Sequence, residues 1–332
     1  MKVLVTGGAG YIGSVVADEL LQAGHEVVVL DNLSHGHRHA VPKDAELIVA
    51  DLADRDHLDQ IFQSRAFDAV IHLAALIEAG ESMKAPEQFF RNNTANALTL
   101  LEAMLAAGVK RLVFSSTAAL FGNPERTPIE EDDALRPTNA YGESKLLVER
   151  MLAWFHQIHG LRFASLRYFN AAGASRPDKG EAHQPESHLV PRIIQVALGR
   201  APHATIFGTD YPTPDGTCVR DYIHVSDLAH AHLLALEATG KNALAKERPL
   251  IYNLGNGQGF SVREVVEVVR KVTGHAIPIV ESPRRPGDPA ILIASSEKIR
   301  RELGWQPRFA GLEAIVDSAW QWHSSHPDGY RK

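Results

Sequence analysis

Short apolar runs alternate with helix-like stretches along the first half of the chain. Six of these runs have the length and the branched, apolar composition of buried strands. They lie at 2–6, 26–30, 46–49, 69–73, 111–114 and 163–167. Helix-like stretches lie between them, such as 96–107, which stops at Gly108. Strands that alternate with helices predict a parallel sheet covered on both faces. Ligands bind beyond the carboxyl ends of such strands, so we expect the site in the loops that follow these runs.

The pattern changes beyond Gly173. A polar stretch with two prolines, 174–187, predicts a long loop. Strand-like runs return at 221–225 and 250–254, which predicts that the chain crosses back to the large sheet. A helix, a short strand and two further helices are expected at 188–198, 205–207, 261–272 and 312–323. The helix at 261–272 opens with a serine–glutamate capping box.

A glycine-rich turn follows the first apolar run directly. Gly7, Gly10 and Gly13 precede a helix-like stretch that ends near Gly24. Such a turn lets phosphate oxygens approach backbone N–H groups at the positive end of a helix. Asp31 ends the next strand, where a carboxylate can accept hydrogen bonds from both hydroxyls of an adenosine ribose and repel a 2′-phosphate. The pattern predicts a dinucleotide site that favours NAD over NADP; a purely structural turn is the less favoured alternative.

A second group of candidate residues lies at the start of a later helix. Tyr141 and Lys145 are four residues apart, so on a helix they share a face. A free tyrosine has a pKa of about 10, and a nearby ammonium, helped by an oxidised nicotinamide, would make it a usable general base. Thr117 follows the strand at 111–114, and we choose its hydroxyl as the partner of Tyr141. Ser115, in the same run, could instead cap a turn, and a surface aromatic–lysine pair is the alternative for Tyr141 and Lys145.

Composition limits the class of protein. The 332 residues carry a formal net charge of −6, which gives no support for binding nucleic acid or an anionic membrane. Cys218 is the single cysteine, which excludes an internal disulfide framework and fits a reducing cytoplasm. A strand that begins at Lys2 leaves no room for a signal peptide, and no apolar run approaches the ~20 residues that span a bilayer. We therefore expect a soluble, cytoplasmic protein.

Three closely spaced histidines are the candidates for metal binding. His35, His37 and His39 follow the strand that ends in Asp31, and we interpret them as a solvated loop beside the adenosine. Cys218 has no paired thiol or evident base, so we assign it no nucleophilic role. We expect no metal site.

The motifs resemble those of the extended short-chain dehydrogenase/reductase family, and specifically its nucleotide-sugar 4-epimerases. The matching stretches are 6–13, 139–145, 166–170, 215–225, 252–255, 284–289 and 302–305. The resemblance implies an α/β fold: a Rossmann-type doubly wound parallel sheet with a smaller C-terminal α/β domain. The NAD-binding domain would comprise residues 1–175, with about 219–258 crossing back to it. The UDP-sugar-binding domain would comprise 176–218 and 259–332.

The resemblance also implies an activity. The chain would be an NAD-dependent isomerase of galactose metabolism that interconverts UDP-glucose and UDP-galactose through a 4-keto intermediate with tightly bound NAD. It would act as a homodimer. Besides Gly7, Gly10 and Gly13, the implied NAD contacts are Tyr11, Ile12, Asp31, Asn32, Asp51, Leu52, Leu73, Ala74, Ala75, Asn92, Lys145 and Phe169. The implied UDP-sugar contacts are Thr117, Tyr141, Asn170, His188, Leu189, Thr205, Ile206, Phe207, Arg220, Arg285 and Asp288.

Some positions depart from the family's pattern. Ile77 stands where some members have a lysine that contacts NAD, and His188 stands where some have asparagine. Leu292 occupies a position that limits the room around the C2 substituent of the sugar. A 4-epimerase of UDP-N-acetylglucosamine or of a UDP-pentose is therefore the alternative within the family.

Two other activities are less favoured. Nucleotide-sugar 4,6-dehydratases place acidic residues directly after the active-site threonine, where this chain has Ala118 and Ala119. A non-catalytic NAD-binding sensor is the alternative from a different class. The intact set of Thr117, Tyr141 and Lys145 argues against it, because a sensor does not need a proton-transfer group.

Overall fold

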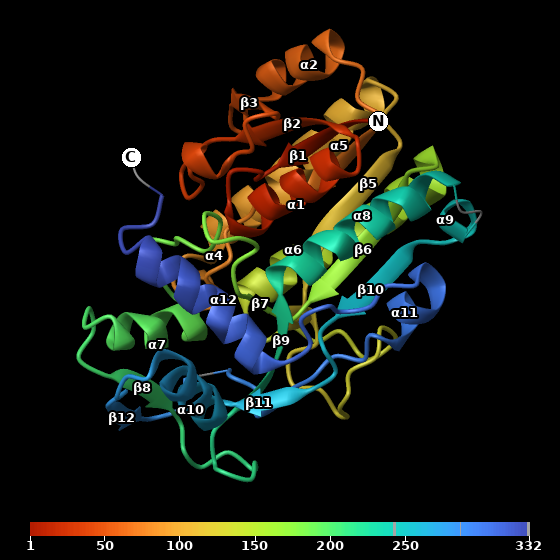
Figure 1. Cartoon of the computed structure of the whole chain (residues 1–332). Helices are drawn as coiled ribbons and strands as arrows, with labels where there is room; N and C mark the ends of the chain where they lie inside the picture. The colour runs from red at the N-terminus through yellow and green to blue at the C-terminus, as the bar shows by residue number, and fades with distance from the viewer. Residues whose placement is uncertain (242–243, 286, 331–332) are drawn as a thin grey trace.

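The centre of the molecule is a parallel sheet of seven strands. The computed structural model describes residues 1–241, 244–285 and 287–330. The strand order is β10-β6-β5-β4-β1-β2-β3, and every neighbouring pair is parallel (Figure 1). The strands are β1 (Lys2–Thr6), β2 (Glu26–Asp31), β3 (Glu46–Val49), β4 (Ala69–His72), β5 (Arg111–Thr117), β6 (Arg162–Tyr168) and β10 (Leu250–Leu254). The doubly wound α/β fold predicted from the sequence is confirmed.

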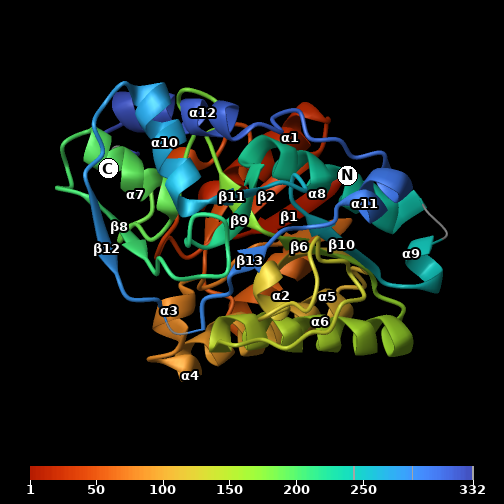
Figure 2. The same ribbon diagram turned by 90° about the horizontal axis from the view of Figure 1, so that it is seen from below.

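Helices cover both faces of this sheet. In Figure 2, α1 (Tyr11–Gln22) and α8 (Val225–Lys241) lie on one face, and α2 (Arg55–Ser64), α5 (Asn96–Ala106) and α6 (Ala140–His159) lie on the other. Along β1, Val3 and Val5 pack into the core beneath α1 and α8, whereas Leu4 packs into the opposite core. Strands buried on both faces need apolar side chains at every position, which explains why these runs are continuous rather than alternating.

A smaller second part lies beyond the carboxyl ends of the large sheet. It contains one sheet of β7 (Asn170–Ala172), β9 (Val219–His224), β11 (Gly259–Ser261) and β13 (Ile291–Leu292), and a parallel pair, β8 (Ala204–Phe207) and β12 (Ile279–Ser282). Its core is formed with α7 (Leu189–Ala197), α10 (Val262–Thr273) and α12 (Leu312–Ser325). The predicted capping box of α10 is present, since Ser261 accepts a hydrogen bond from the Glu264 amide and Glu264 accepts one from the Ser261 amide.

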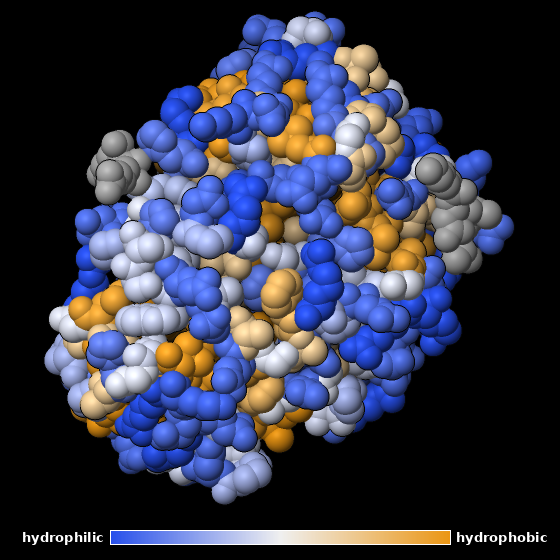
Figure 3. All heavy atoms as spheres, in the orientation of Figure 1, coloured by the Kyte–Doolittle hydropathy of each residue, from blue (hydrophilic) through white to orange (hydrophobic). Residues whose placement is uncertain are grey.

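Short helical segments connect these elements. They are Arg38–Ala40, α3 (Ala79–Ser82), α4 (Pro86–Phe89), Phe90–Ala95, Ala118–Leu120, α9 (Leu244–Glu247) and α11 (Glu297–Leu303). Polar side chains cover most of the face seen in Figure 1, and apolar ones gather in several separate patches (Figure 3). Among the described residues, no helix combines the length and the apolar character needed to cross a membrane.

One expectation about topology is wrong. The strand predicted at 221–225 does not join the large sheet: it is β9, which pairs with β7, β11 and β13. Only the second returning strand, β10, crosses back, and it occupies the edge beside β6. Asp221 in the middle of β9 accepts hydrogen bonds from the backbone amides of Asn256, Gly257 and Ala294, at 2.8, 3.0 and 3.1 Å. This buried carboxylate holds β9 against the loops of the smaller sheet. The apolar residues around Asp221 in the sequence do not indicate which sheet the strand joins.

Candidate active site

A cleft lies along the carboxyl edge of the large sheet. It is lined by residues that end or follow β1, β2, β3, β4, β5 and β6, as expected for a parallel sheet with helices on both faces. Every predicted NAD contact except Lys145 lines this cleft, and so do the predicted substrate contacts Thr117, Tyr141, Asn170 and His188. One continuous cavity therefore joins the glycine turn and Asp31 to Thr117 and Tyr141.

The glycine turn leaves the start of α1 open to a phosphate. Gly7 has a φ of +71°, and a Cβ on Gly13 would lie 2.1 Å from the Gly7 carbonyl oxygen. Gly10 is the residue before the first turn of α1, and no side chain there covers the helix N-terminus. These backbone features fit the pyrophosphate of a dinucleotide.

Asp31 is held by the backbone around it. Its carboxylate accepts hydrogen bonds from the amides of Ala9 at 3.0 Å and Leu33 at 2.8 Å, and burial raises its pKa. A Cβ on Gly36 would lie only 2.8 Å from one of the carboxylate oxygens, so glycine leaves room beside the acid. Each carboxylate oxygen can accept a further hydrogen bond, which fits a ribose diol.

The first turn of α6 carries Tyr141 into the cleft. The side chain of Asn139 caps this helix by accepting a hydrogen bond from the Gly142 amide at 2.8 Å. Burial raises the pKa of Tyr141 to about 12, and the nearby Thr117 hydroxyl opposes this shift. Thr117 accepts a hydrogen bond from the Ala119 amide at 3.1 Å, which leaves its own proton available for the phenol.

Lys145 lies on the buried side of α6. The ammonium of Lys145 donates a hydrogen bond to the Ser115 carbonyl at 2.9 Å, and Lys145 is 2% exposed. Burial lowers the pKa of Lys145 to about 7. The sequence led us to expect that the Lys145 ammonium lowers the pKa of Tyr141. In the structure burial outweighs that effect, and the pKa of Tyr141 is raised.

The remaining predicted substrate residues lie outside the cleft, in the smaller part. Arg220 is 2.5 Å from Asp288, and its side chain is only 13% exposed, so it is not a solvated surface arginine. The guanidinium of Arg285 stacks on the ring of Phe207 at 4.0 Å. Pro286, in the same predicted motif, lies outside the described residues.

Asn170 connects this group to the cleft. Its amide donates to the Asp221 carbonyl at 3.0 Å, directly beside Arg220 in β9. Thr205 and Phe207 are partly exposed on β8, whereas the side chain of Ile206 is buried, so only its backbone is available to a ligand. Leu189 is the first residue of α7 and packs against the core of the smaller part.

Sequence reasoning missed several residues of the cleft. Ser115 does not cap a turn: its hydroxyl makes a close contact with the phenol of Tyr168, and both side chains line the cleft. Glu78 also lines the cleft. Tyr168 ends β6, so its position at a strand's carboxyl end was the available signal.

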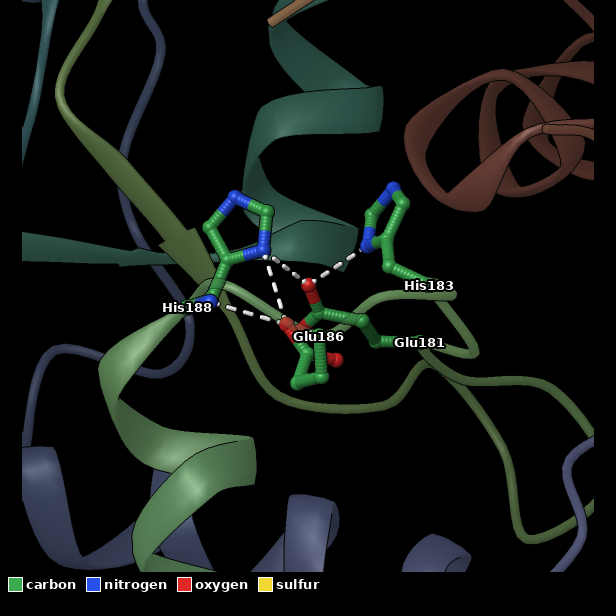
Figure 4. Close-up of side chains that lie close together, drawn as sticks. All are labelled: Glu181, His183, Glu186 and His188. Carbon is green, nitrogen blue, oxygen red and sulfur yellow. Dashed lines mark hydrogen bonds and ion pairs between the residues drawn. The ribbon is translucent and has the colours of Figure 1, made fainter. Parts of the chain in front are cut away.

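A compact polar group surrounds His188. Figure 4 shows His183 and His188 pointing at the carboxylate of Glu181, with Glu186 beside them. The Nδ1 atoms of His183 and His188 lie 2.8 Å and 2.6 Å from Glu181 Oε1. Although burial disfavours the imidazolium, the charge of Glu181 raises the pKa of His188 well above its ordinary value. His188, predicted as a substrate contact, is thus engaged with acidic side chains on one side and faces the cleft on the other.

Comparison with known proteins adds a third line of evidence. Residues 3–255 match the NAD dependent epimerase/dehydratase family. A UDP-glucose 4-epimerase of Streptomyces lividans is 56% identical over 330 residues, which are 99% of this chain and 98% of that protein. A crystal structure of a UDP-glucose 4-epimerase matches with a TM-score of 0.96 and 47% identity over 100% of both chains. Another, from Bifidobacterium longum in complex with NAD+ and UDP, matches with a TM-score of 0.94 and 36% identity over 99% of this chain and 100% of that one.

Proposed function

This chain belongs to the NAD-dependent epimerase/dehydratase family, and from that membership we propose that it is a nucleotide-sugar 4-epimerase with tightly bound NAD. It interconverts UDP-glucose and UDP-galactose through a 4-keto intermediate. The single observation that carries the proposal is the shared cleft: Thr117 and Tyr141 open into the same cavity as the glycine turn and Asp31. A proton-transfer group beside a dinucleotide site is what reversible oxidation of an alcohol requires.

The chain's own residues have distinct roles in this reaction. When bound, NAD would supply a hydride acceptor and donor for C4 of the sugar. The phenolate of Tyr141, bridged by the Thr117 hydroxyl, accepts the proton of the 4-hydroxyl, and the resulting phenol gives it back. Lys145, when protonated, places a positive charge beneath the cleft, where its amine donates to the Ser115 carbonyl. The protonated amine and the bound cofactor lower the cost of forming a phenolate in this buried position.

The UDP group is held by the smaller part of the molecule. Arg220 and Arg285 bind the diphosphate, because guanidinium groups match the geometry of phosphate oxygens. Because the two arginines hold the diphosphate in place, the 4-keto sugar can rotate about its bond to the diphosphate. Thr205 and Phe207, with the Ile206 backbone, line the uracil site, and Asp288 binds the uridine ribose. Asn170, His188 and Leu189 complete the sugar site.

This assignment divides the chain by ligand. Residues 1–175 and about 219–258 form the NAD-binding domain, and 176–218 and 259–332 form the UDP-sugar-binding domain. The exceptions are β9, which pairs within the smaller sheet and carries Arg220 to the diphosphate, and Thr117, Tyr141 and Asn170, which reach the sugar from the NAD-binding domain. Of the last range, Pro286 and residues 331–332 lie outside the described residues. Leu292 is partly buried against a cluster that includes Phe169, which supports its role in limiting space near the sugar.

The protein acts as a cytoplasmic homodimer in this proposal. Trp154 and Ile158 on α6 are 59% and 65% exposed, and Leu98 on the neighbouring α5 is also exposed. Helices α5 and α6 lie side by side in Figure 2. Large apolar side chains on two adjacent helices are typical of a surface that a second subunit covers. Sedimentation of the wild-type chain and of Trp154→Glu would test this assignment: the wild type should be a dimer and the variant a monomer.

Product analysis tests the activity. The purified protein is incubated separately with UDP-glucose, UDP-N-acetylglucosamine and UDP-xylose, without added cofactor, and products are identified by NMR. We expect UDP-glucose to give UDP-galactose. If only UDP-N-acetylglucosamine or only UDP-xylose is converted, that sugar replaces UDP-glucose as the proposed substrate. If none of the three is converted, the result favours a non-catalytic NAD-binding sensor.

A further inference from the structure

Four potential metal ligands converge in the loop between β7 and α7. Glu181, His183, Glu186 and His188 each offer one ligand atom, and these atoms all lie within 4.8 Å of one another (Figure 4). All four come from a stretch of eight residues, so a local fold of the loop suffices to bring them together.

Two buried carboxylates face two imidazoles in this group. The side chains of Glu181 and Glu186 are 3% and 6% exposed. Within 1–241, 244–285 and 287–330, no lysine or arginine forms an ion pair with either carboxylate, and only His183 and His188 do so. Buried carboxylates are costly unless they are paired or coordinate a metal. A divalent cation bound by the two imidazoles in their neutral form would supply the positive charge that protonated histidines otherwise provide.

We propose that Glu181, His183, Glu186 and His188 bind one divalent transition-metal ion, and that this ion is zinc. Imidazole nitrogens and carboxylate oxygens are both zinc ligands, and four of them match the tetrahedral coordination of zinc. Zinc bonds of about 2.0–2.2 Å place ligand atoms about 3.3 Å apart. The present separations from Glu181 Oε1 are 2.8 Å to His183 and 2.6 Å to His188. Each has to open by less than about 1 Å, which rotation of the two rings can provide.

The loop that carries the ligands is anchored on both sides. The indole of Trp322 on α12 donates to the Glu181 carbonyl at 2.7 Å, and His37 Nε2 lies 2.8 Å from the Ala182 carbonyl. A Cβ on Gly180 would lie 2.4 Å from the Trp322 ring, so the backbone is packed closely against that helix. Fixed backbone around the ligands favours metal binding because little conformational freedom remains to be lost.

The ion would connect the two parts of the molecule. His183 and His188 line the cleft, and the ring of His183 lies 6.2 Å from that of Tyr11, the first residue of α1. A metal bound here clamps the loop between the glycine turn and α7. It also holds His188 at the edge of the substrate site. The site stands independently of the proposed activity, because the clamp needs no substrate.

Metal titration of the full-length, tag-free chain tests the proposal directly. After treatment with EDTA and desalting, the protein is titrated with zinc chloride by calorimetry, and bound zinc is measured by elemental analysis after a second desalting step. We expect one zinc per chain and a rise in Tm of about 4 °C at a hundredfold excess over Kd. His183→Gln and Glu186→Gln should each weaken zinc binding by about a hundredfold or more. His39→Gln, an exposed histidine of the other histidine-rich segment, is the matched control and should bind zinc like the wild type.

Cobalt provides a readout that does not depend on the variants. Cobalt(II) added to the wild-type chain should give the visible absorption of a tetrahedral site, saturating at one equivalent. Absence of this absorption together with no retained zinc would overturn the proposal. So would zinc binding that is equally strong in folded His183→Gln or Glu186→Gln protein.

Discussion

The cofactor side, which is the cleft itself, and the proposed substrate side, in the smaller part beside it, are built in different ways. On the cofactor side, the backbone forms the site: glycines leave the start of α1 open, and two backbone amides hold the Asp31 carboxylate in place. On the substrate side, side chains from distant segments hold one another, as in the ion pair of Arg220 with Asp288 and the stacking of Arg285 on Phe207. The cofactor side is therefore organised by the fold itself, whereas the proposed substrate side depends on charged side chains that already have partners, as Arg220 has Asp288.

Tyr141, where the two sides meet, should give the largest effect. Tyr141→Phe removes the proton acceptor, so turnover should fall by about 10²–10⁴-fold while bound NAD stays unchanged. Turnover is followed by NMR and cofactor by release on denaturation. Tyr222→Phe, a buried tyrosine of β9 outside the cleft, is the control and should keep its activity. Near-normal turnover of Tyr141→Phe would remove this residue from its role.

Arg220 tests the substrate side. Arg220→Met removes a charged donor to the diphosphate and leaves Asp288 without its partner, so KM for UDP-glucose should rise by about 10–100-fold. Bound NAD should not change, because the cofactor side does not rely on this arginine. Arg263→Met, at the exposed pair with Glu281, should leave KM unaltered. An Arg220→Met protein that loses NAD at normal KM would reverse the proposed division of the cleft.

Asp31 tests the cofactor side with a smaller expected effect. Asp31→Asn keeps the shape of the side chain but removes the negative charge, so affinity for NAD should fall by about 10-fold and discrimination against NADP should narrow. Equilibrium dialysis of both dinucleotides measures the change. Asp59→Asn, at the surface pair with Arg55, is the matched control. Unchanged preference for NAD would show that Asp31 does not meet the ribose.

Lys145 should give the smallest effect, a change in how the free energy of unfolding depends on pH. Its pKa of about 7 in the folded chain lies below its ordinary value of 10.5. Between these values the unfolded chain binds more protons, so the free energy of unfolding should increase with pH from about 7 to about 10. Lys145→Met should show a flatter pH dependence over this window in urea unfolding. An identical slope in both proteins would mean that Lys145 keeps its ordinary pKa in the folded chain.

The same contrast explains what could be predicted from sequence. The strands of the large sheet, the glycine turn and the placement of Thr117 and Tyr141 depend on local patterns and on one rule about parallel sheets, so they were accessible. The sheet to which β9 belongs could not be predicted. It depends on the hydrogen bonds of the Asp221 carboxylate with backbone amides that are distant in the sequence. The direction of the Tyr141 shift depends on burial by distant segments. The cluster of Glu181 and His188 had a signal, two glutamates and two histidines within eight residues, but whether their side chains converge depends on how the loop folds.

The most direct test of the account follows the hydrogen at C4 of the sugar. UDP-glucose that carries deuterium at C4 is converted in ordinary water, and the UDP-galactose formed is analysed by NMR. If this hydrogen is stored inside the cleft beside Tyr141 and returned to the opposite face, the product retains deuterium at C4. Product whose C4 position has exchanged with solvent would contradict the account.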